Sequence, residues 1–193
     1  MRPVTSVIRN TVFAAILSAT SLTISPAAAE EVYMIRGFLN IFSDGMNQMT
    51  RKLRSRGIRA TAISNGDWRG IAQKIIRRSK QKKVSYPIVI VGHSLGGVEA
   101  PDFANTLGAA GVPVALVIGL DPGFRSPNRF GRGTKRVINY KIPSGKNYRR
   151  GRGFKGKITT IDVSKFGVDH VGIDKNKNIQ RLVIQKIRAQ VKK

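Results

Sequence analysis

The segment from Pro87 to Gly97, PIVIVGHSLGG, constrains the fold of this chain more than any other part of it. Its first half is apolar and rich in β-branched residues, which is typical of a buried strand. Its second half has the pattern Gly-x-Ser-x-Gly and leads into a helix-compatible stretch. A strand, a sharp turn and a helix in this order predict a nucleophile elbow with Ser94 exposed at its tip. Glycines at 92 and 96 allow a strained turn and close packing of the helix on the strand.

The same short motif also arises by chance, as a plain connection between a strand and a helix. Here a buried strand directly precedes it and Gly97 extends the turn, and this context favours a catalytic serine. Leu95 is the first residue of the expected helix. Its N–H is the candidate donor to an oxyanion that forms beside Ser94.

Apolar and amphipathic stretches alternate along the rest of the chain. Besides the elbow strand, strands are expected at residues 31–39, 58–63, 113–120, 136–142 and 157–163. Helices are expected from Asp44, from Trp68, after Ser94 and after a cap at Asp174. The central strands are apolar on both faces, whereas the last two alternate like partly exposed strands. This pattern predicts an α/β fold with a mostly parallel central sheet, helices on both faces, and a site beyond the carboxyl ends of the strands.

Residues 1–29 are typical of a secretory signal peptide. Two arginines give a positively charged start, an apolar stretch follows, and three alanines ending at Ala29 offer a cleavage site. The apolar stretch is too short and too interrupted by Ser and Thr for a membrane span. We therefore expect cleavage near Ala29, export to the periplasm or the medium, and a single domain over residues 30–193. An uncleaved amphipathic helix is the alternative.

The chain is strongly basic and contains no cysteine. Its formal charge is +25, and +23 remains once the two arginines of the leader are removed. The lack of cysteine excludes disulfides, cysteine nucleophiles and cysteine-rich zinc sites. Nothing in the sequence implies a metal ion or an organic cofactor. A positive charge of this size attracts polyanions, and for an exported protein these are membrane headgroups or anionic envelope polymers rather than nucleic acid.

The positive charge is concentrated in residues 123–157, which hold twelve basic residues and no acidic one. Aromatic residues are interleaved with them, namely Phe124, Phe130, Tyr140, Tyr148 and Phe154. Arginine and aromatic side chains together are typical of an RNA-binding surface. A solvated loop beside an edge strand, or a surface that contacts membranes, has the same composition. We favour these two interpretations over nucleic-acid binding.

A serine nucleophile needs a base, which is nearly always histidine. The chain has two histidines. His93 is adjacent to Ser94 on the elbow, so its side chain leaves the turn in another direction and is expected to pack against the sheet. His170 follows the last expected strand, on a loop that emerges at the same end of the sheet as Ser94. Although a lone loop histidine is often only a surface residue, its place after the nucleophile makes His170 the candidate base.

The third member of such a site is an acid that orients the histidine. Most acidic residues are at the mature terminus, at helix starts, on the elbow helix or inside a strand. Asp169 is adjacent to His170 and would have to fold back on its neighbour. Asp121 ends a strand at the sheet edge where the site is expected, although an aspartate before Pro122 can also serve only as a turn former. We assign the acid to Asp121.

A second oxyanion donor has to come from the loop after the first strand. Arg36, Gly37 and Phe38 occupy that place. Gly37 allows a close approach of the backbone, and the N–H of Phe38 is the best candidate.

With these residues in place, the chain resembles the α/β-hydrolase superfamily, especially its small lipase-like and esterase-like members. The resemblance rests on the sequence GHSLGG at the elbow, on Asp121 before a proline and on the late Asp169-His170 pair. It covers nearly all of the mature chain. It implies an acyl-transfer enzyme with Ser94, His170 and Asp121 as a catalytic triad and Leu95 and Phe38 as oxyanion donors.

Three features depart from the usual pattern of that superfamily. The usual acid follows a later strand, many lipases have His-Gly where this chain has Arg36-Gly37, and the domain is too short for a large lid. An open site implies a plain esterase or thioesterase more than an interfacially activated lipase, with a small ester or lipid-like substrate. The alternatives are a protein of this fold that mainly binds anionic envelope components through residues 123–157 and, third, a nucleic-acid binder.

Overall fold

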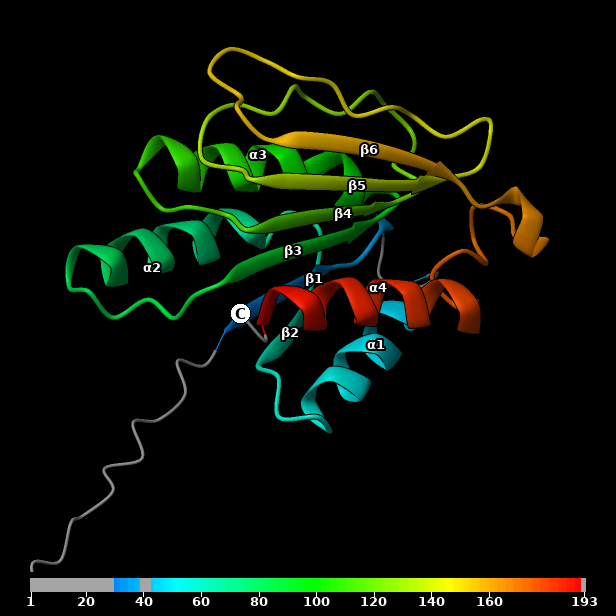
Figure 1. The fold of residues 1–193 in the computed structure, drawn as a ribbon, viewed down its shortest axis with the longest axis horizontal. Coiled ribbons are helices and arrows are strands. Elements are labelled where there is room, and N and C mark those ends of the chain that lie inside the picture. Colours follow the sequence, from blue (N-terminus) through cyan, green and yellow to red (C-terminus); the bar gives the residue numbers. More distant parts are fainter. Residues whose placement is uncertain (1–29, 39–42, 192–193) are drawn as a thin grey trace, which may run out of the picture.

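The computed structural model describes residues 30–38 and 43–191, so the expected signal peptide lies outside the described residues. Within this range, the strands form one sheet in the order β2-β1-β3-β4-β5-β6, and every neighbouring pair is parallel (Figure 1). The strands are β1 (Glu31–Ile35), β2 (Ala60–Ile63), β3 (Ile88–His93), β4 (Leu116–Leu120), β5 (Arg136–Lys141) and β6 (Lys157–Asp162). The helices are α1 (Asp44–Arg54), α2 (Trp68–Lys80), α3 (Leu95–Ala109), the short 3-10 helix η2 (Ser164–Phe166) and α4 (Lys177–Val191).

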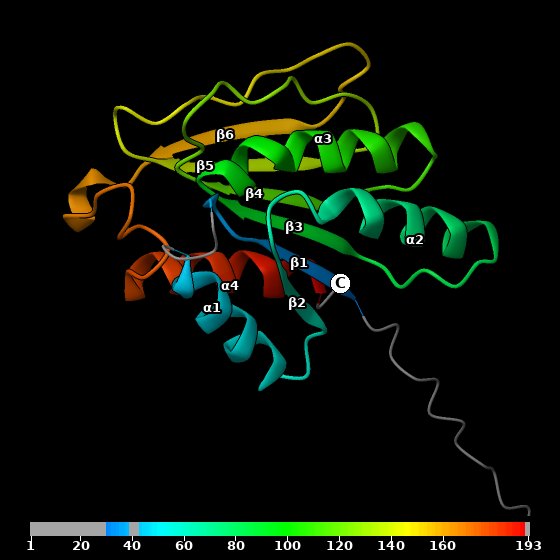
Figure 2. The same ribbon diagram turned by 180° about the vertical axis from the view of Figure 1, so that it is seen from behind.

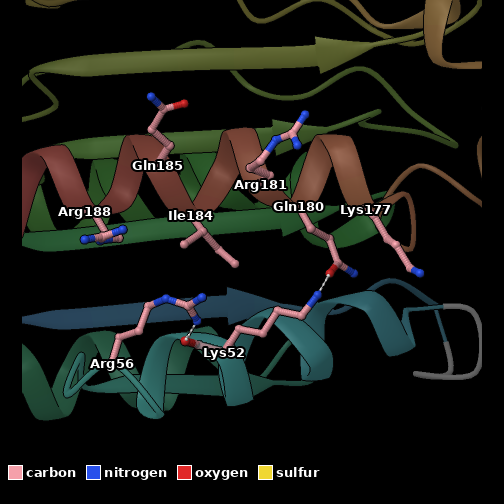
Figure 3. Close-up of a pocket in the computed structure, with 8 residues that line it drawn as sticks. All are labelled: Lys52, Arg56, Lys177, Gln180, Arg181, Ile184, Gln185 and Arg188. Carbon is pink, nitrogen blue, oxygen red and sulfur yellow. Dashed lines mark hydrogen bonds between the residues drawn. The ribbon is translucent and has the colours of Figure 1, made fainter.

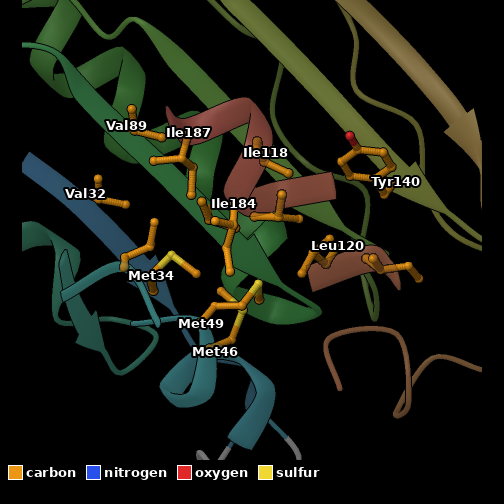
Figure 4. Close-up of a cluster of buried hydrophobic side chains, with 14 of the residues drawn as sticks. Val32, Met34, Met46, Met49, Val89, Ile118, Leu120, Tyr140, Ile184 and Ile187 are labelled. Atoms are coloured by element: carbon orange, nitrogen blue, oxygen red, sulfur yellow. The ribbon is translucent and has the colours of Figure 1, made fainter. Parts of the chain in front are cut away.

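Helices cover both faces of the sheet, as the sequence predicts. Helices α1 and α4 lie on one face, and α2 and α3 lie on the other, which Figure 2 shows from behind. Successive residues of β3 alternate between two apolar cores, because neighbouring side chains of a strand point to opposite faces. Val89, which Figure 4 labels, and Val91 join the core under α1 and α4, whereas Ile88 and Ile90 join the core under α2 and α3. No described helix is long and apolar enough to cross a bilayer.

The connections after β4 and β5 carry aromatic side chains that cover the sheet where α2 and α3 do not reach. Phe130, Tyr148 and Phe154 are buried and pack against one another, with ring centroids of Phe130 and Tyr148 5.1 Å apart. They belong to the core that includes Val137 of β5. The alternating sequence of β5 predicted a partly exposed strand, but the middle of β5 is buried. The reason is that these aromatic side chains cover one face of β5 and that β6 pairs with its outer edge.

The same burial changes the interpretation of the basic segment. Three of its interleaved aromatic side chains fill the core, and Tyr140 of β5 is buried on the opposite face. Phe124 alone among the five is exposed. The alternation of basic and aromatic residues therefore reflects a loop that packs its aromatic side chains inward, and it does not provide a row of rings for stacking on bases.

The start of the last helix also differs from the prediction. Asn176, not Asp174, caps α4: its side-chain oxygen accepts the N–H groups of Asn178 and Ile179. Asp174 is instead fully buried, and it lies against Gly45 at the start of α1.

Candidate active site

The elbow has the backbone geometry that its sequence predicts. Ser94, between β3 and α3, has φ 55° and ψ −121°, a conformation that residues with a side chain rarely adopt. A Cβ on Gly92 would collide with the backbone of Gly96, and one on Gly96 would collide with the carbonyl group of Ile35. The two glycines therefore let α3 start directly against the sheet. The side chain of Ser94 is more enclosed than expected, since the residue is 4% exposed.

The structure brings the predicted serine, histidine and aspartate together. Ser94 Oγ lies 2.8 Å from His170 Nε2, and His170 Nδ1 lies 2.6 Å from Asp121 Oδ2. Ser94 and Asp121 follow neighbouring strands β3 and β4, so the parallel sheet places them at the same edge. His170 arrives from the segment after β6, which extends beyond the carboxyl ends of the strands (orange in Figure 1).

Asp121 and Asp169 lie in different surroundings. Asp121 is 2% exposed, and its second carboxylate oxygen accepts the N–H of Ile142 at 3.2 Å. Asp169 is exposed, and its carboxylate accepts the N–H of Gly172 at 2.6 Å within its own turn. Of the two, the buried Asp121 makes the hydrogen bond to His170.

The two histidines have opposite electrostatic environments. The hydrogen bond to Asp121 raises the pKa of His170 above its usual value, and partial burial opposes this only in part. Burial lowers the pKa of His93 to about 4, although its hydrogen bond to the carbonyl group of His170 favours the charged form. At neutral pH His93 is therefore uncharged.

A small apolar pocket of about 180 Å³ opens beside Ser94. Three of the residues that line it are exposed and apolar, namely Phe38, Phe124 and Val171, and the ring centroids of the two phenylalanines are 6.3 Å apart. Ser94 and His170 line the same pocket. Of the two predicted oxyanion residues, Phe38 lines this pocket. Leu95 begins α3 directly after Ser94 and is not among the residues that line it.

Two buried polar residues, Ser43 and His93, also line this pocket, and the sequence alone does not indicate the contacts that they make. Ser43 Oγ accepts the N–H of Gly37 at 2.8 Å and lies 2.8 Å from His93 Nδ1. His93 Nε2 lies 2.9 Å from the carbonyl oxygen of His170. Asp174 Oδ2 is 4.0 Å from His93 Nδ1, beyond hydrogen-bond distance. The sequence predicted that His93 packs against the sheet, but nothing around Ser43 distinguishes it from an ordinary residue before a helix.

Comparison with known proteins places the chain in a family. The model of class 3 lipases matches residues 8–112, more than half of the chain and including the elbow. The chain belongs to the class 3 lipase family. It is therefore a hydrolase of the α/β-hydrolase superfamily, as the elbow motif predicted. No curated protein matches the chain.

Solved structures share the fold of this lipase-family chain at low sequence identity. Est1E from Butyrivibrio proteoclasticus is 14% identical and superposes with a TM-score of 0.56, over 89% of this chain and 92% of that one. Human thioesterase 2 is 9% identical, with a TM-score of 0.52 over 85% of this chain and 97% of that one. These similarities confirm the predicted α/β-hydrolase architecture.

The opposite environments of the two histidines lead to a testable prediction. In an NMR titration of the ring signals, we expect His170 to gain its proton at a pH above the ordinary histidine pKa of about 6.5. His93 should stay neutral until the pH falls to about 4. A His93→Asn variant identifies which signal belongs to which ring. Two overlapping titrations near pH 6.5 would contradict the geometry described above.

Proposed function

We propose that the protein hydrolyses carboxylic esters or thioesters by acyl transfer through Ser94. The observation that supports this most directly is the continuous hydrogen-bonded line from Ser94 Oγ through the ring of His170 to the buried carboxylate of Asp121. Each member has the environment that its role requires. The serine lies at a strained turn, the histidine is half-buried and the aspartate is sequestered from water.

In the proposed reaction, Ser94 Oγ attacks the carbonyl carbon of the ester while His170 Nε2 accepts the hydroxyl proton. Asp121 holds His170 with its proton on Nδ1 and stabilises the imidazolium that forms. The protonated His170 then donates its proton to the leaving alcohol or thiol as the tetrahedral intermediate collapses to an acyl-serine. Water, activated by the same ring, releases the acid and restores Ser94.

The oxyanion of the tetrahedral intermediate needs N–H donors that have no other partner. The N–H of Leu95 is at the start of α3, where the helix dipole favours negative charge. On the loop after β1, the N–H of Gly37 is already used by Ser43. We therefore assign the second donor to the next residue, Phe38.

The pocket beside Ser94 favours a small apolar acyl group. Its volume of about 180 Å³ is close to the roughly 150 Å³ of an apolar protein cavity that holds one benzene ring. An acyl chain of about six carbons or an aryl group has this size. Exposed Phe38, Phe124 and Val171 extend the apolar surface at the rim, where a longer chain would emerge toward solvent.

We also propose that the protein is exported. A leader over residues 1–29, with cleavage near Ala29, would leave Glu30 at the mature terminus directly before β1. It would place the enzyme in the periplasm or the medium, where membrane lipids and envelope polymers supply ester substrates and anionic surfaces.

A second candidate function is binding to such anionic surfaces, and two basic regions favour it. The first is the 123–157 segment, whose Arg149, Arg150 and Arg152 are all exposed. The second is a groove of about 480 Å³ between α1 and α4 (Figure 3). Five basic residues and no acidic residue line the groove: Lys52, Arg56, Lys177, Arg181 and Arg188. Lys52 donates to Gln180 and Arg56 to the carbonyl group of Lys52, so neither charge is neutralised by these contacts.

The enzyme proposal predicts that Ser94→Ala abolishes hydrolysis of short p-nitrophenyl esters. Removing a triad nucleophile costs on the order of 10⁴-fold or more in kcat. The measurement is turnover with purified protein, and circular dichroism shows that the variant is folded. Unchanged turnover in a folded Ser94→Ala protein would contradict the proposal.

Matched substitutions of Asp121 and Asp169 test which carboxylate orients His170. Asp121→Asn should lower kcat by roughly 10⁴-fold, because the amide favours the wrong tautomer of His170. It should also move the acidic limb of the pH profile to lower pH: His170 must be neutral to act as base, and Asp121 is the group that raises its pKa. Asp169→Asn should leave both nearly unchanged. The reverse order of effects would assign the acid to Asp169.

The binding proposal predicts salt-dependent association with anionic phosphatidylglycerol vesicles, strong at low salt and weak once the Debye length shortens to about 10 Å at 0.1 M. Charge reversal to glutamate at Arg149, Arg150 and Arg152 tests the first region, and reversal at Lys52 and Arg188 tests the groove. Each should weaken vesicle binding and leave turnover of a small neutral ester unchanged. Binding that ignores salt and both reversals would exclude this second function. Loss of ester turnover with binding intact would make the segment part of substrate recognition.

A further inference from the structure

Ser43 and His93 are buried polar residues that the proposed reaction does not use. We propose that they act as positioning residues, which join the oxyanion loop and the His170 loop to each other next to Ser94. This inference rests on the proposed function, since it assigns these residues a part in the same reaction. Both residues line the pocket beside Ser94, but their side chains make no hydrogen bond to the side chains of Ser94, His170 or Asp121. Their effect on the reaction therefore passes through the two loops that they hold.

Ser43 and His93 form a series of three hydrogen bonds that begins at the N–H of Gly37 and ends at the carbonyl oxygen of His170. The chemistry of these two end groups determines the direction of each bond. The N–H of Gly37 can only donate, so Ser43 Oγ accepts from it and is free to donate its own proton to His93 Nδ1. The carbonyl group of His170 can only accept, so His93 Nε2 has to carry the ring proton. One tautomer of a neutral His93 satisfies Gly37, Ser43 and the carbonyl group of His170 together, and burial keeps the ring neutral. The buried Asp174 carboxylate, 4.0 Å from Nδ1, makes no hydrogen bond to the ring.

This series of hydrogen bonds connects three segments that are distant in sequence. Gly37 precedes the proposed donor Phe38, and its backbone is so close to the elbow that a Cβ would lie 3.1 Å from Ser94 Cβ. At the other end, the carbonyl group of His170 belongs to the residue that is proposed as the base. The two ends of the His93 ring thus hold the loop of the oxyanion donor and the loop of the base on either side of the nucleophile.

The side chain of Ser43 does not cap the helix that it precedes. It occupies the N-cap position of α1, where a serine hydroxyl commonly accepts an N–H from the first turn of the helix. Here the side chain makes no capping hydrogen bond. Its hydroxyl points instead to Gly37 and His93, and Ser43 is 1% exposed. A residue that served only the helix would use its hydroxyl there.

The two arms of the His93 ring can be tested separately. His93→Asn keeps an acceptor near the position of Nδ1, for Ser43, and loses the bond to His170. His93→Gln keeps a donor near the position of Nε2 and loses the bond to Ser43, and Ser43→Ala breaks the same arm from its other side. We expect each variant to lower kcat for a p-nitrophenyl ester about tenfold or more, with KM within about twofold, because misplacement of catalytic groups by 1 Å can cost about 10²-fold.

Thr50→Val is the matched control. Thr50 is a buried residue of α1 whose hydroxyl donates to the carbonyl group of Met46 at 2.8 Å, without a contact to the site. It should lose stability as Ser43→Ala does but retain wild-type kcat. In addition, Ser43→Ala combined with His93→Gln should be no worse than Ser43→Ala alone, because Ser43→Ala already removes the hydrogen bond that His93→Gln loses.

The tautomer of His93 in the wild-type protein gives a test that needs no variant. A long-range proton–nitrogen NMR spectrum at neutral pH should show the His93 proton on Nε2 and none on Nδ1. A proton on Nδ1 would overturn the proposal. So would Ser43 and His93 variants that lose no more kcat than Thr50→Val at the same melting temperature. These failures are distinguishable from failure of the proposed function, in which wild-type protein does not hydrolyse esters or Ser94→Ala still does.

Discussion

The left-handed backbone of Ser94 is the constraint on which the rest of the site depends. A residue with a side chain at φ 55° is strained, and it persists only where its surroundings hold it. Here the helix after it packs so closely on β1 and β3 that Gly92 and Gly96 cannot carry a side chain. The parallel sheet then brings Asp121 to the same edge, and the segment after β6 delivers His170.

Much of this arrangement could be predicted from the sequence, because its signals are local. The apolar run before GHSLGG identifies a buried strand, and its glycines identify the turn. Asp121 and His170 follow from topology: in a parallel sheet, residues that end strands meet at one edge. The structure brings all three side chains within hydrogen-bond distance, and their catalytic roles remain predictions.

Other features could not be predicted, because they depend on contacts between segments distant in sequence. Ser43 resembles an ordinary helix cap, and only the folded chain shows its hydroxyl facing His93. Asp174 was expected to cap a helix and is instead buried beside α1, with Asn176 in its place. Phe130, Tyr148 and Phe154 lie outside the expected strands and helices, so the sequence does not indicate that they pack over β5.

The most direct test of the central claim is covalent labelling with a fluorophosphonate, followed by peptide mapping. Such a probe reacts with a serine that a neighbouring base activates, whatever the natural substrate is. We predict one adduct, on the peptide that contains Ser94, and much slower labelling of a His170→Gln variant. An unlabelled but folded wild-type protein, or an adduct on another serine, would contradict the account of Ser94 as an activated nucleophile.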